Sequence, residues 1–515
     1  MDLGILLDAI KDKILNPDEE LKEKLITNIC HNSEKATPNS LFVCCRGSAA
    51  DGHMYALSAY ENGARVFVAE HEINLPDDAY VIIVKDSKEA LSELAERFFS
   101  YPARYIKIIG VTGTKGKTTY AMSVYLICEM YGIKAGYIGT NGIYYNGKRF
   151  HSENTTPGAL EIQTTLRDMA DAGIELCIIE VSSQALWQNR IHGIEFDTCV
   201  FTNLYKDHIG GAEHPDFEHY KNSKKKLFTD YKAKHIIVNA DSDASGFMCE
   251  GACTGDIITV SAEGNVGASL YATDAKMTKK NNIPGVEYIC HIGNDKRFNE
   301  KIKSMKTFIP FPGLYSVENS LEVTATCLLL GIDFEYICNS SANIKIPGRY
   351  EYITLNSLPG SLFIIDYAHN GISLSSTIDA LRMYKPSRII CLFGSVGGRT
   401  FHRRAELGKA AMEGADISII TSDNPNFEDP MSVIGDIEKE FINSGKEYYT
   451  VADRELAIIK AYEMARPGDY ILLAGKGHED YQLIGGVRVR FSEKDILYEL
   501  DRVNSLSEEY DRDII

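Results

Sequence analysis

The segment that decides the fold is Ile108–Tyr120, IIGVTGTKGKTTY, in which an apolar run meets a glycine-rich turn and then residues that favour a helix. Gly113 and Gly116 permit backbone angles and close approaches that a Cβ atom would block. The turn frees backbone amides to point at a phosphate, and the positive end of the helix adds to the attraction. Lys117 would reach the terminal phosphates of a nucleotide, and the Thr118 hydroxyl would contact magnesium. The segment therefore predicts a strand, a phosphate-binding loop and a helix.

The loop departs from the strict P-loop pattern G-x-x-x-x-G-K-[ST]. Val111 stands where the first glycine belongs, and Gly113 follows two residues later. An accidental glycine turn is the alternative interpretation. The order of strand, loop, Lys-Thr pair and helix is the one that phosphate binding requires, so it favours a nucleotide site.

Composition narrows the class of protein. The chain has 515 residues, a length that suggests roughly three domains. Its net charge of -18 would repel nucleic acid and anionic membranes, so we expect neither as a partner. The 12 cysteines show neither zinc-ligand spacing nor a disulfide framework, which is typical of free thiols in a reducing compartment. The N-terminus lacks a signal-peptide pattern, and no apolar run approaches the roughly 18 residues that span a bilayer. We therefore expect a cytoplasmic protein.

Three segments along the chain indicate three α/β domains. Residues 1–104 hold short strands such as SLFVCC and ARVFVAE, with helical stretches between them. Residues 105–347 alternate strands with helices, the pattern of a parallel sheet with crossover helices. Residues 348–515 resume that alternation, and their apolar runs end in Asp, Gly or Ser, as buried parallel strands do.

Further polar residues follow two predicted strands of the central segment. ELCIIEVSS places Glu180 near the end of one strand, and TCVFTNLYKDHIG places Asp207 and His208 just past the next. Ligands of open α/β sheets bind at these strand ends, where a carboxylate can hold the magnesium that the phosphates also hold. Taken alone, Glu180 could be a salt-bridge partner and His208 a structural residue. The coincidence of three strand ends favours a functional site.

Motifs along nearly the whole chain resemble the Mur ligases of peptidoglycan synthesis. TGTKGKTT, EVSSQAL, TNLYKDH, KKKLF, PGLYSVEN, IPGRYE, IDYAHN and AGKGHEDYQ occur in the order of that family. SDNPNFEDP and AGKGHEDYQLIGG resemble the members that add the third peptide residue. The resemblance implies a first domain for the UDP end of the substrate, a central P-loop-type ATPase domain with a parallel sheet, and a C-terminal Rossmann-like domain for the amino acid.

The resemblance also implies a reaction, the ADP-forming ligation of an amino acid to UDP-N-acetylmuramoyl-L-alanyl-D-glutamate. ATP would phosphorylate the free carboxylate of the bound dipeptide, and the amine would then attack the acyl phosphate. A carboxylate is a poor acyl donor because oxide would have to leave, whereas phosphate leaves readily. Since both reactants are anionic, magnesium and lysine must offset their repulsion. Both substrates are small molecules, and we expect a monomer.

The resemblance assigns the ATP and metal sites residue by residue. Lys224, selected by the pattern K-x-x-L-F, matches a lysine carbamylated by CO2. A solvated basic helix face is the alternative for Lys224 and its lysine neighbours, and Arg349 could instead form a helix cap or an inter-domain ion pair. The implied catalytic residues are Lys117, Lys224 and His208. Two magnesium ions are implied, with the ligands Thr118, Glu180, His208 and the carbamate of Lys224. The implied ATP contacts are Gly113, Thr114, Lys115, Gly116, Lys117, Thr118, Thr119, Asn319, Arg349 and Asp366.

The substrate contacts are implied in the same way. The residues that match contacts to the UDP-sugar dipeptide are Ser33, Ser48, Thr155, Thr156, Ser182, Gln188 and Arg190. Arg190 suits the glutamate carboxylate, because a planar guanidinium can pair with two oxygens at once. The residues that match contacts to the incoming amino acid are Arg399, Asp423, Asn424, Asn426, Gly475 and Glu479.

The identity of the amino acid turns on one position. Family members that use meso-diaminopimelate carry an arginine after DNP, whereas this chain has Asn426 in SDNPNFEDP. Asparagine cannot form a bidentate ion pair with the far carboxylate of a diamino diacid. We therefore predict L-lysine. Meso-diaminopimelate and L-ornithine remain alternatives, since ornithine differs from lysine by one methylene, worth about 1 kcal/mol.

Two other functions compete with this prediction. A folylpolyglutamate synthase would lack a UDP-binding segment, and the residues 1–104 that precede the phosphate loop disfavour it. A nucleotide-gated binding protein without catalysis would be expected to have lost Lys224 or His208, and both are present.

Overall fold

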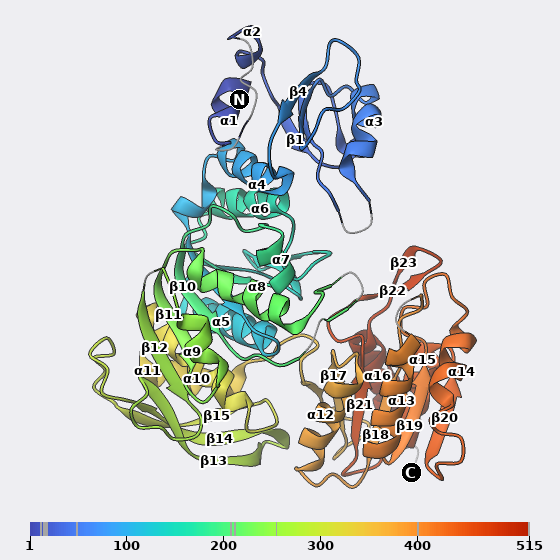
Figure 1. Ribbon diagram of the computed structural model, residues 1–515. Helices are drawn as coiled ribbons and strands as arrows, with labels where there is room; N and C mark the ends of the chain where they lie inside the picture. Colours follow the sequence, from blue (N-terminus) through green and yellow to red (C-terminus); the bar gives the residue numbers. More distant parts are fainter. Residues whose placement is uncertain are drawn as a thin grey trace. The chain divides into compact units, whose positions relative to one another are not determined.

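The computed structural model describes residues 1–10, 13, 19–47, 50–206, 209–210, 213–253, 255–398 and 401–512. The chain divides into two compact units, whose elements Figure 1 colours along the sequence. The first unit contains Met1–Tyr271, Ile292–Lys303 and Leu321–Phe334, and the second contains Ala272–His291, Ser304–Ser320 and the residues from Glu335 onward. None of the described helices combines the length and the apolar surface that crossing a bilayer demands.

The chain begins with a small parallel sheet. Its strands are β1 Asn28–Cys30, β2 Ser40–Val43, β3 Val66–Ala69 and β4 Tyr80–Ile83, in that spatial order. The helices of this segment are α1 Leu3–Leu7, α2 Glu19–Lys22, α3 Ala56–Glu61 and α4 Ser87–Phe98, with the 3-10 turns η1 Ser33–Lys35 and η2 Gly52–Tyr55. β2 and β3 are buried along their whole length, which explains why their sequences are continuous apolar runs. Asp86 caps α4, because its carboxylate accepts from the amides of Lys88 and Glu89.

A larger mixed sheet carries the glycine-rich loop. Its strand order is β15-β14-β13-β12-β11-β10-β5-β9-β6-β7-β8. β5 pairs in parallel with β10 on one side and with β9 on the other, so the carboxyl ends of these three strands lie at one edge. The bounds are β5 Lys107–Thr112, β6 Ala135–Gly139, β7 Gly142–Tyr145, β8 Lys148–Phe150, β9 Leu176–Glu180, β10 Phe196–Phe201, β11 Ala233–Asn239, β12 Asp256–Ser261, β13 Leu270–Lys280, β14 Ile283–Ile292 and β15 Ser304–Ile309.

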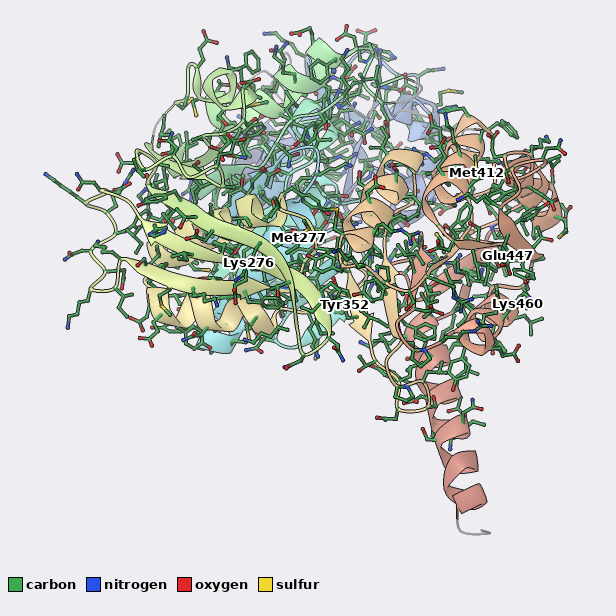
Figure 2. The ribbon with its side chains drawn as sticks, turned by 90° about the horizontal axis from the view of Figure 1, so that it is seen from below. Lys276, Met277, Tyr352, Met412, Glu447 and Lys460 are labelled. Carbon is green, nitrogen blue, oxygen red and sulfur yellow. The ribbon has the colours of Figure 1, made fainter. Side chains whose placement is uncertain are left out.

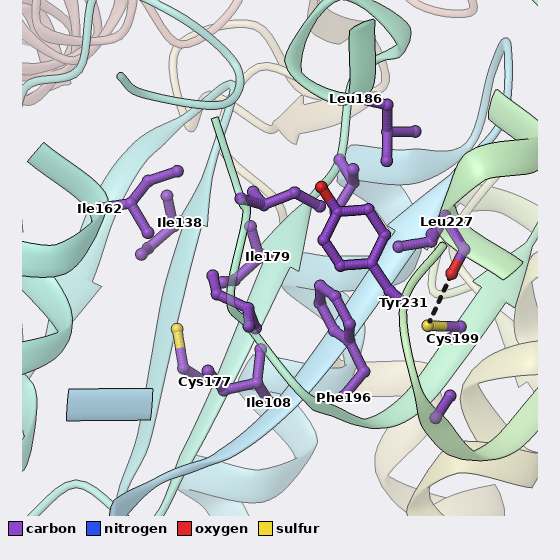
Figure 3. Packing of buried hydrophobic residues seen from close by; sticks show 14 of the residues in the cluster. Ile108, Ile138, Ile162, Cys177, Ile179, Leu186, Phe196, Cys199, Leu227 and Tyr231 are labelled. Carbon is purple, nitrogen blue, oxygen red and sulfur yellow. Dashed lines mark hydrogen bonds between the residues drawn. The ribbon is translucent and has the colours of Figure 1, made fainter. Parts of the chain in front are cut away.

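Helices α6 to α9 and the central strands share one apolar core. The helices from this part of the chain are α5 Lys117–Tyr131, α6 Ala159–Asp171, α7 Ser183–Trp187, α8 Phe217–Thr229, α9 Ala244–Cys249, α10 Ser316–Leu329 and α11 Phe334–Ser340, with the turns η3 Pro102–Tyr105 and η4 Ser341–Asn343. Figure 3 shows Ile108 of β5 and Ile179 of β9 in the core with Leu227 of α8. The Cys199 thiol donates to the Leu227 carbonyl at 3.7 Å, which ties β10 to α8. This core fixes the strand ends on which the candidate site is built.

The C-terminal segment forms a six-stranded sheet with the order β16-β17-β21-β18-β19-β20. β16 is antiparallel to β17, and the other pairs are parallel. The bounds are β16 Glu351–Ile353, β17 Leu362–Asp366, β18 Ile389–Phe393, β19 Ile417–Thr421, β20 Glu447–Val451 and β21 Tyr470–Ala474. The helices are α12 Gly371–Arg382, α13 Phe401–Gly414, α14 Pro430–Glu438, α15 Arg454–Met464 and α16 Glu493–Arg512, and a hairpin joins β22 Tyr481–Ile484 to β23 Val487–Arg490.

The β13–β14 hairpin belongs to the same compact unit as this C-terminal sheet. Met277 and Ile283 of the hairpin pack against the core of the C-terminal sheet. Figure 2 labels Met277 together with Tyr352 of β16, another partly buried residue that packs against that core. The expected α/β fold with parallel sheets in the central and C-terminal segments is confirmed. The boundaries after residues 104 and 347 stay predictions.

Candidate active site

The glycine-rich loop connects the end of β5 to α5, which begins at Lys117. Gly113 approaches the residues after β10 so closely that a Cβ atom there would overlap the Thr202 hydroxyl. Gly116, the residue before α5, has a φ of 86°, a left-handed angle that favours glycine. The two glycines let the chain turn from strand to helix against β10, and they bring the positive end of α5 to the carboxyl edge of the sheet.

Asn203 fixes the middle of this loop. The Thr114 amide donates to the Asn203 carbonyl at 2.9 Å, and the Lys115 amide donates to Asn203 Oδ1 at 2.9 Å. The Thr202 hydroxyl donates to the Lys115 carbonyl at 2.7 Å. Asn203 thus takes up two backbone amides of the glycine-rich loop.

Two lysines converge on one carbonyl of the loop. Lys117 Nζ donates to the Gly113 carbonyl at 2.7 Å and to the Thr114 carbonyl at 3.2 Å. Lys224 Nζ, from α8, donates to the same Gly113 carbonyl at 2.9 Å, and its side chain is only 1% exposed. The Lys224 ammonium also lies 4.5 Å from the centre of the Tyr220 ring. Two positive groups around one carbonyl make a place where an anion, or a carboxylate-like group, is favoured.

The Glu180 carboxylate, at the end of β9, is fully buried and accepts from several donors. Thr118 Oγ1 donates to Oε2 at 2.9 Å, Thr140 Oγ1 donates to Oε2 at 3.0 Å, and the Thr140 amide donates to Oε1 at 3.1 Å. The Tyr137 hydroxyl also donates to Oε1. Burial, together with the Glu180 charge, raises the pKa of Tyr137 well above its usual range, so its phenol stays protonated as a donor. Gly139 leaves the space for this contact, because a Cβ atom there would overlap both Glu180 and Tyr137.

Thr118 and Glu180 together fit a magnesium ion. The hydroxyl oxygen and the carboxylate are 2.9 Å apart at the start of α5, beside the Lys117 side chain. Both are oxygen ligands of the kind that magnesium prefers, and magnesium usually takes only one or two protein oxygens alongside phosphate oxygens. The predicted pairing of Thr118 with Glu180 is thus present in the geometry.

The residues predicted to hold the dipeptide form a second group beside Glu180. Thr156 Oγ1 donates to the Glu180 carbonyl at 2.7 Å and accepts from the Ser182 amide at 2.9 Å. Arg190 Nη1 donates to the Thr156 carbonyl at 2.7 Å, while Nε and Nη2 both donate to Gln188 Oε1, at 3.1 and 2.8 Å. Thr155 joins this group to the surroundings of Glu180, because its hydroxyl lies 3.0 Å from that of Thr140, which donates to Glu180. Burial lowers the pKa of Arg190.

Sequence reasoning missed several residues of this region. Thr140 follows β6 at the same edge of the sheet as Glu180, so the strand-end argument could have found it. His214 gave no such signal: it is fully buried, with Nε2 2.8 Å from Ser183 Oγ and Nδ1 2.7 Å from His219 Nδ1. Tyr220, whose ring packs against His214, donates its hydroxyl to Thr114 Oγ1 at 3.0 Å. These contacts link α7 and α8 to the phosphate loop.

The second unit contains the other predicted ATP contacts. Asn319 lies on α10. The Asp366 carboxylate, at the end of β17, accepts from the Tyr350 amide at 3.0 Å and from the Ala368 amide at 2.9 Å. Burial raises the pKa of Asp366, and the Arg349 charge opposes that shift. The Arg349 guanidinium lies 4.9 Å from the centre of the Tyr367 ring. Arg349 and Asp366 are therefore electrostatic neighbours.

The residues predicted to bind the amino acid gather at the carboxyl ends of β19 and β21. Asn424 Nδ2 donates to Glu479 Oε2 at 3.0 Å. Lys476 Nζ, fully buried, donates to Glu479 Oε2 at 2.7 Å and lies 3.6 Å from Asp423 Oδ1. Gly475 has a φ of 106°, and an added Cβ atom would lie 3.0 Å from Asp423 Oδ2. We refer to Asp423, Asn424, Lys476 and Glu479 as the carboxylate–lysine cluster.

Asn426 has a structural role beside this cluster. Its φ of 54° is left-handed, a conformation that asparagine tolerates better than most residues. Its amide donates to the Leu483 carbonyl at 2.8 Å, and its Oδ1 accepts from the Gly486 amide at 3.1 Å. The side chain therefore holds the turn between β22 and β23.

The remaining predicted positions lie outside these groups. Ser33 is buried in η1 of the small parallel sheet segment, where its carbonyl accepts from Asn62 Nδ2 at 2.9 Å. Ser48, Asp207, His208 and Arg399 lie outside the described residues.

This chain is similar to known proteins over nearly its full length. Three family models match the chain. The model of the Mur ligase middle domain matches residues 111–327, the model of the Mur ligase glutamate ligase domain matches residues 348–477, and the model of the Mur ligase family catalytic domain matches residues 25–99. A UDP-N-acetylmuramoyl-L-alanyl-D-glutamate–2,6-diaminopimelate ligase of Clostridium botulinum is 36% identical over 504 residues, which cover 97% of this chain and 99% of the relative.

Solved structures share the fold. A structure of a UDP-N-acetylmuramoyl-L-alanyl-D-glutamate–2,6-diaminopimelate ligase superposes with a TM-score of 0.67 at 24% identity, covering 98% of this chain and 99% of that one. A folylpolyglutamate synthase of Mycobacterium tuberculosis, complexed with ADP, gives a TM-score of 0.57 at 14% identity, covering 74% of this chain and 90% of that one.

Proposed function

Because this chain belongs to the Mur ligase family, a family of ATP-dependent amide ligases, we propose that it adds 2,6-diaminopimelate as the third peptide residue to UDP-N-acetylmuramoyl-L-alanyl-D-glutamate. The observation that carries the proposal is the 36% identity, over 97% of the chain, to a relative whose name states that reaction. The match over residues 25–99 disfavours a folate ligase, because the folylpolyglutamate synthase covers only 74% of the chain.

The amino acid proposed here differs from the L-lysine that the sequence motif predicted. That prediction rested on Asn426 in place of an arginine. The asparagine is explained by its left-handed backbone and its bond to the Gly486 amide, so its lack of charge says little about the substrate. The relatives whose names state 2,6-diaminopimelate are therefore stronger evidence for the amino acid than the residue at position 426. L-lysine and L-ornithine are the competing substrates in the test below.

The phosphate loop and Glu180 support the first half of the reaction. Thr118 and Glu180 would hold a magnesium ion, whose charge would bring the γ-phosphate and the dipeptide carboxylate together. Lys117 would move from the Gly113 and Thr114 carbonyls to the terminal phosphate, a better partner for an ammonium group. Arg190, which already spans Thr156 and Gln188, would orient the carboxylate of the dipeptide by its remaining N–H groups.

A carbamate on Lys224 is consistent with the same geometry. Carbamylation consumes a neutral amine and converts a cation into an anion. At Gly113, it would replace one of two like charges by a carboxylate-like ligand for a second magnesium ion. The carbamate nitrogen keeps one hydrogen, so its bond to the Gly113 carbonyl could persist.

The choice of amino acid is tested by a panel assay. Purified protein is given ATP, magnesium, UDP-N-acetylmuramoyl-L-alanyl-D-glutamate and, in turn, meso-diaminopimelate, L-lysine or L-ornithine. We expect phosphate release that depends on the dipeptide, with kcat/KM for diaminopimelate at least about 10-fold above that for lysine, since a paired carboxylate is worth about 1.5–3 kcal/mol. A higher kcat/KM for lysine would overturn the proposed amino acid and restore the prediction from the motif. Release without any amino acid acceptor would overturn the ligase reaction.

Arg190 gives a second test, on the dipeptide side. We expect Arg190→Met to raise KM for the UDP-dipeptide about 10- to 100-fold and to leave KM for ATP within about 2-fold, because a charge-assisted hydrogen bond is worth about 1.5–3 kcal/mol. Arg167→Met is the matched control, since Arg167 pairs with Asp171 on the exposed face of α6. Equal changes in both KM values would argue that Arg190 only supports the loop that carries it.

A further inference from the structure

Lys476 is a buried lysine that the assignments above leave without a role. Its side chain is 0% exposed, and its ammonium donates to Asn424 Oδ1 at 2.8 Å and to Glu479 Oε2 at 2.7 Å. Asp423 Oδ1 lies 3.6 Å from the same nitrogen. A lysine is rarely buried this completely unless its charge is paired, so the two carboxylates account for its position.

The ammonium fixes the orientation of the Asn424 amide. Asn424 Oδ1 accepts from Lys476 Nζ at 2.8 Å and from the Leu483 amide at 2.9 Å. Both neighbours can only donate, so the oxygen must face them and the amide nitrogen must face Glu479. Glu479 then uses only Oε2 for these two bonds, and its Oε1 takes no hydrogen bond from the described part of the chain. That oxygen is the one available to an amino group of a ligand.

The cluster has an uneven charge. Asp423 and Glu479 contribute two negative charges and Lys476 one positive charge, so the carboxylate–lysine cluster carries one net negative charge. Without Lys476 it would carry two. This difference matters because the candidate amino acids differ in charge: at neutral pH, diaminopimelate has two ammonium and two carboxylate groups, whereas lysine has two ammonium groups and one carboxylate.

A second buried ion pair, Arg454 with Glu493, supports the strand ends that carry the cluster. Arg454, at the start of α15, donates to the Ser422 carbonyl at 3.2 Å and to the Ala474 carbonyl at 2.9 Å. These carbonyls lie at the ends of β19 and β21, directly before the cluster's two loops. Glu493 accepts from Arg454 Nε at 2.9 Å and from Nη2 at 2.7 Å. Arg454 thus braces two strand ends that are separated by β18.

We propose that Lys476 is a specificity-determining residue of the amino-acid site: it holds Asn424 in one orientation and offsets one carboxylate, so that the site accepts an amino acid without net positive charge. This inference rests on the proposed function, because it takes the cluster to be the place where the amino acid binds. Lys476 supplies its positive charge from a fully buried position.

The test measures a ratio rather than a single activity. For wild type, Lys476→Met and Lys476→Gln, kcat/KM is determined with meso-diaminopimelate and with L-lysine. Each substitution doubles the net negative charge of the cluster, so we expect the ratio of diaminopimelate to lysine to fall about 10-fold or more. The glutamine can still donate to Asn424, so it should raise KM for either amino acid less than methionine does. KM for ATP should stay within about 2-fold.

The controls separate this inference from general damage and from the proposed function. Lys409→Met, at a lysine with 65% exposure on α13, should leave the ratio unchanged. If methionine prevents folding, the glutamine variant decides by the same ratio. An unchanged ratio in the Lys476 variants would overturn the inference while leaving the proposed function standing. A wild-type protein that joins neither amino acid would overturn the proposed function first.

Discussion

Lys224→Ala is expected to lower kcat by a factor on the order of 10^3, with little change in the thermal unfolding midpoint. The Lys224 side chain places its nitrogen 2.9 Å from the Gly113 carbonyl, at the centre of the phosphate loop. If the proposed reaction is right, the substitution removes a group that stabilises charge in it, and losses of about 10^2–10^3 are typical when one such group is deleted. Steady-state phosphate release, with all substrates saturating, measures the effect.

A second variant and a rescue experiment decide whether Lys224 acts as a carbamate or as an ammonium group. Lys224→Arg keeps the positive charge but cannot carry a carbamate, so we expect it to be as inactive as the alanine variant. Added acetate or propionate should partly restore Lys224→Ala, because a short carboxylate can occupy the vacated space. Lys225→Ala, on the same helix as Lys224, loses an ion pair with Glu250 and a contact with the Phe247 ring; it serves as the control and should keep near-normal activity. An active arginine variant would rule out the carbamate and leave a role for the ammonium alone.

Sequence patterns identified those parts of the site that lie next to one another along the chain. The glycine-rich loop follows β5, Glu180 ends β9 and Ser182 comes just after it, and strand ends of a parallel sheet meet at one edge. The resemblance alone grouped Thr156 with Ser182, and their hydroxyls are hydrogen-bonded. The strand-end reasoning placed Thr118 near Glu180, and these two side chains are hydrogen-bonded as well. It required only the order of strands and helices, which apolar periodicity indicates.

Other features depend on contacts between distant segments, which one sequence does not reveal. Tyr137, within β6, donates its hydroxyl to Glu180 at the end of β9. In the sequence AGKGHEDYQ, Lys476 has the pattern of an ordinary polar loop residue. Its side chain is nevertheless fully buried beside the carboxylates of Asp423 and Glu479. Asn426 was interpreted by its missing charge, whereas its left-handed φ of 54° is what the turn requires. Side-chain burial and backbone angle, rather than residue type, decided these positions.

Glu180→Gln is expected to separate catalysis from folding at the centre of the site. The carboxylate accepts on Oε1 from the Tyr137 hydroxyl and the Thr140 amide, and on Oε2 from the Thr118 and Thr140 hydroxyls. A glutamine can place its side-chain carbonyl oxygen where Oε1 stood, facing the Tyr137 hydroxyl and the Thr140 amide. Its NH2 group would then face two hydroxyls, which can rotate and accept. The unfolding midpoint should therefore shift by no more than a few degrees, as for a change of about 1 kcal/mol.

Activity should respond very differently from stability. The amide is neutral and a weak ligand for magnesium, so we expect kcat to fall about 10^2- to 10^3-fold. The magnesium concentration that gives half-maximal activity should rise at least about 10-fold, as after loss of a metal-site interaction. Glu129→Gln is the matched control, because Glu129 lies on the exposed end of α5 and only accepts from the Ala135 amide. A folded Glu180→Gln protein with an unchanged magnesium requirement would show that Glu180 supports the loop through its hydrogen bonds and does not bind the metal.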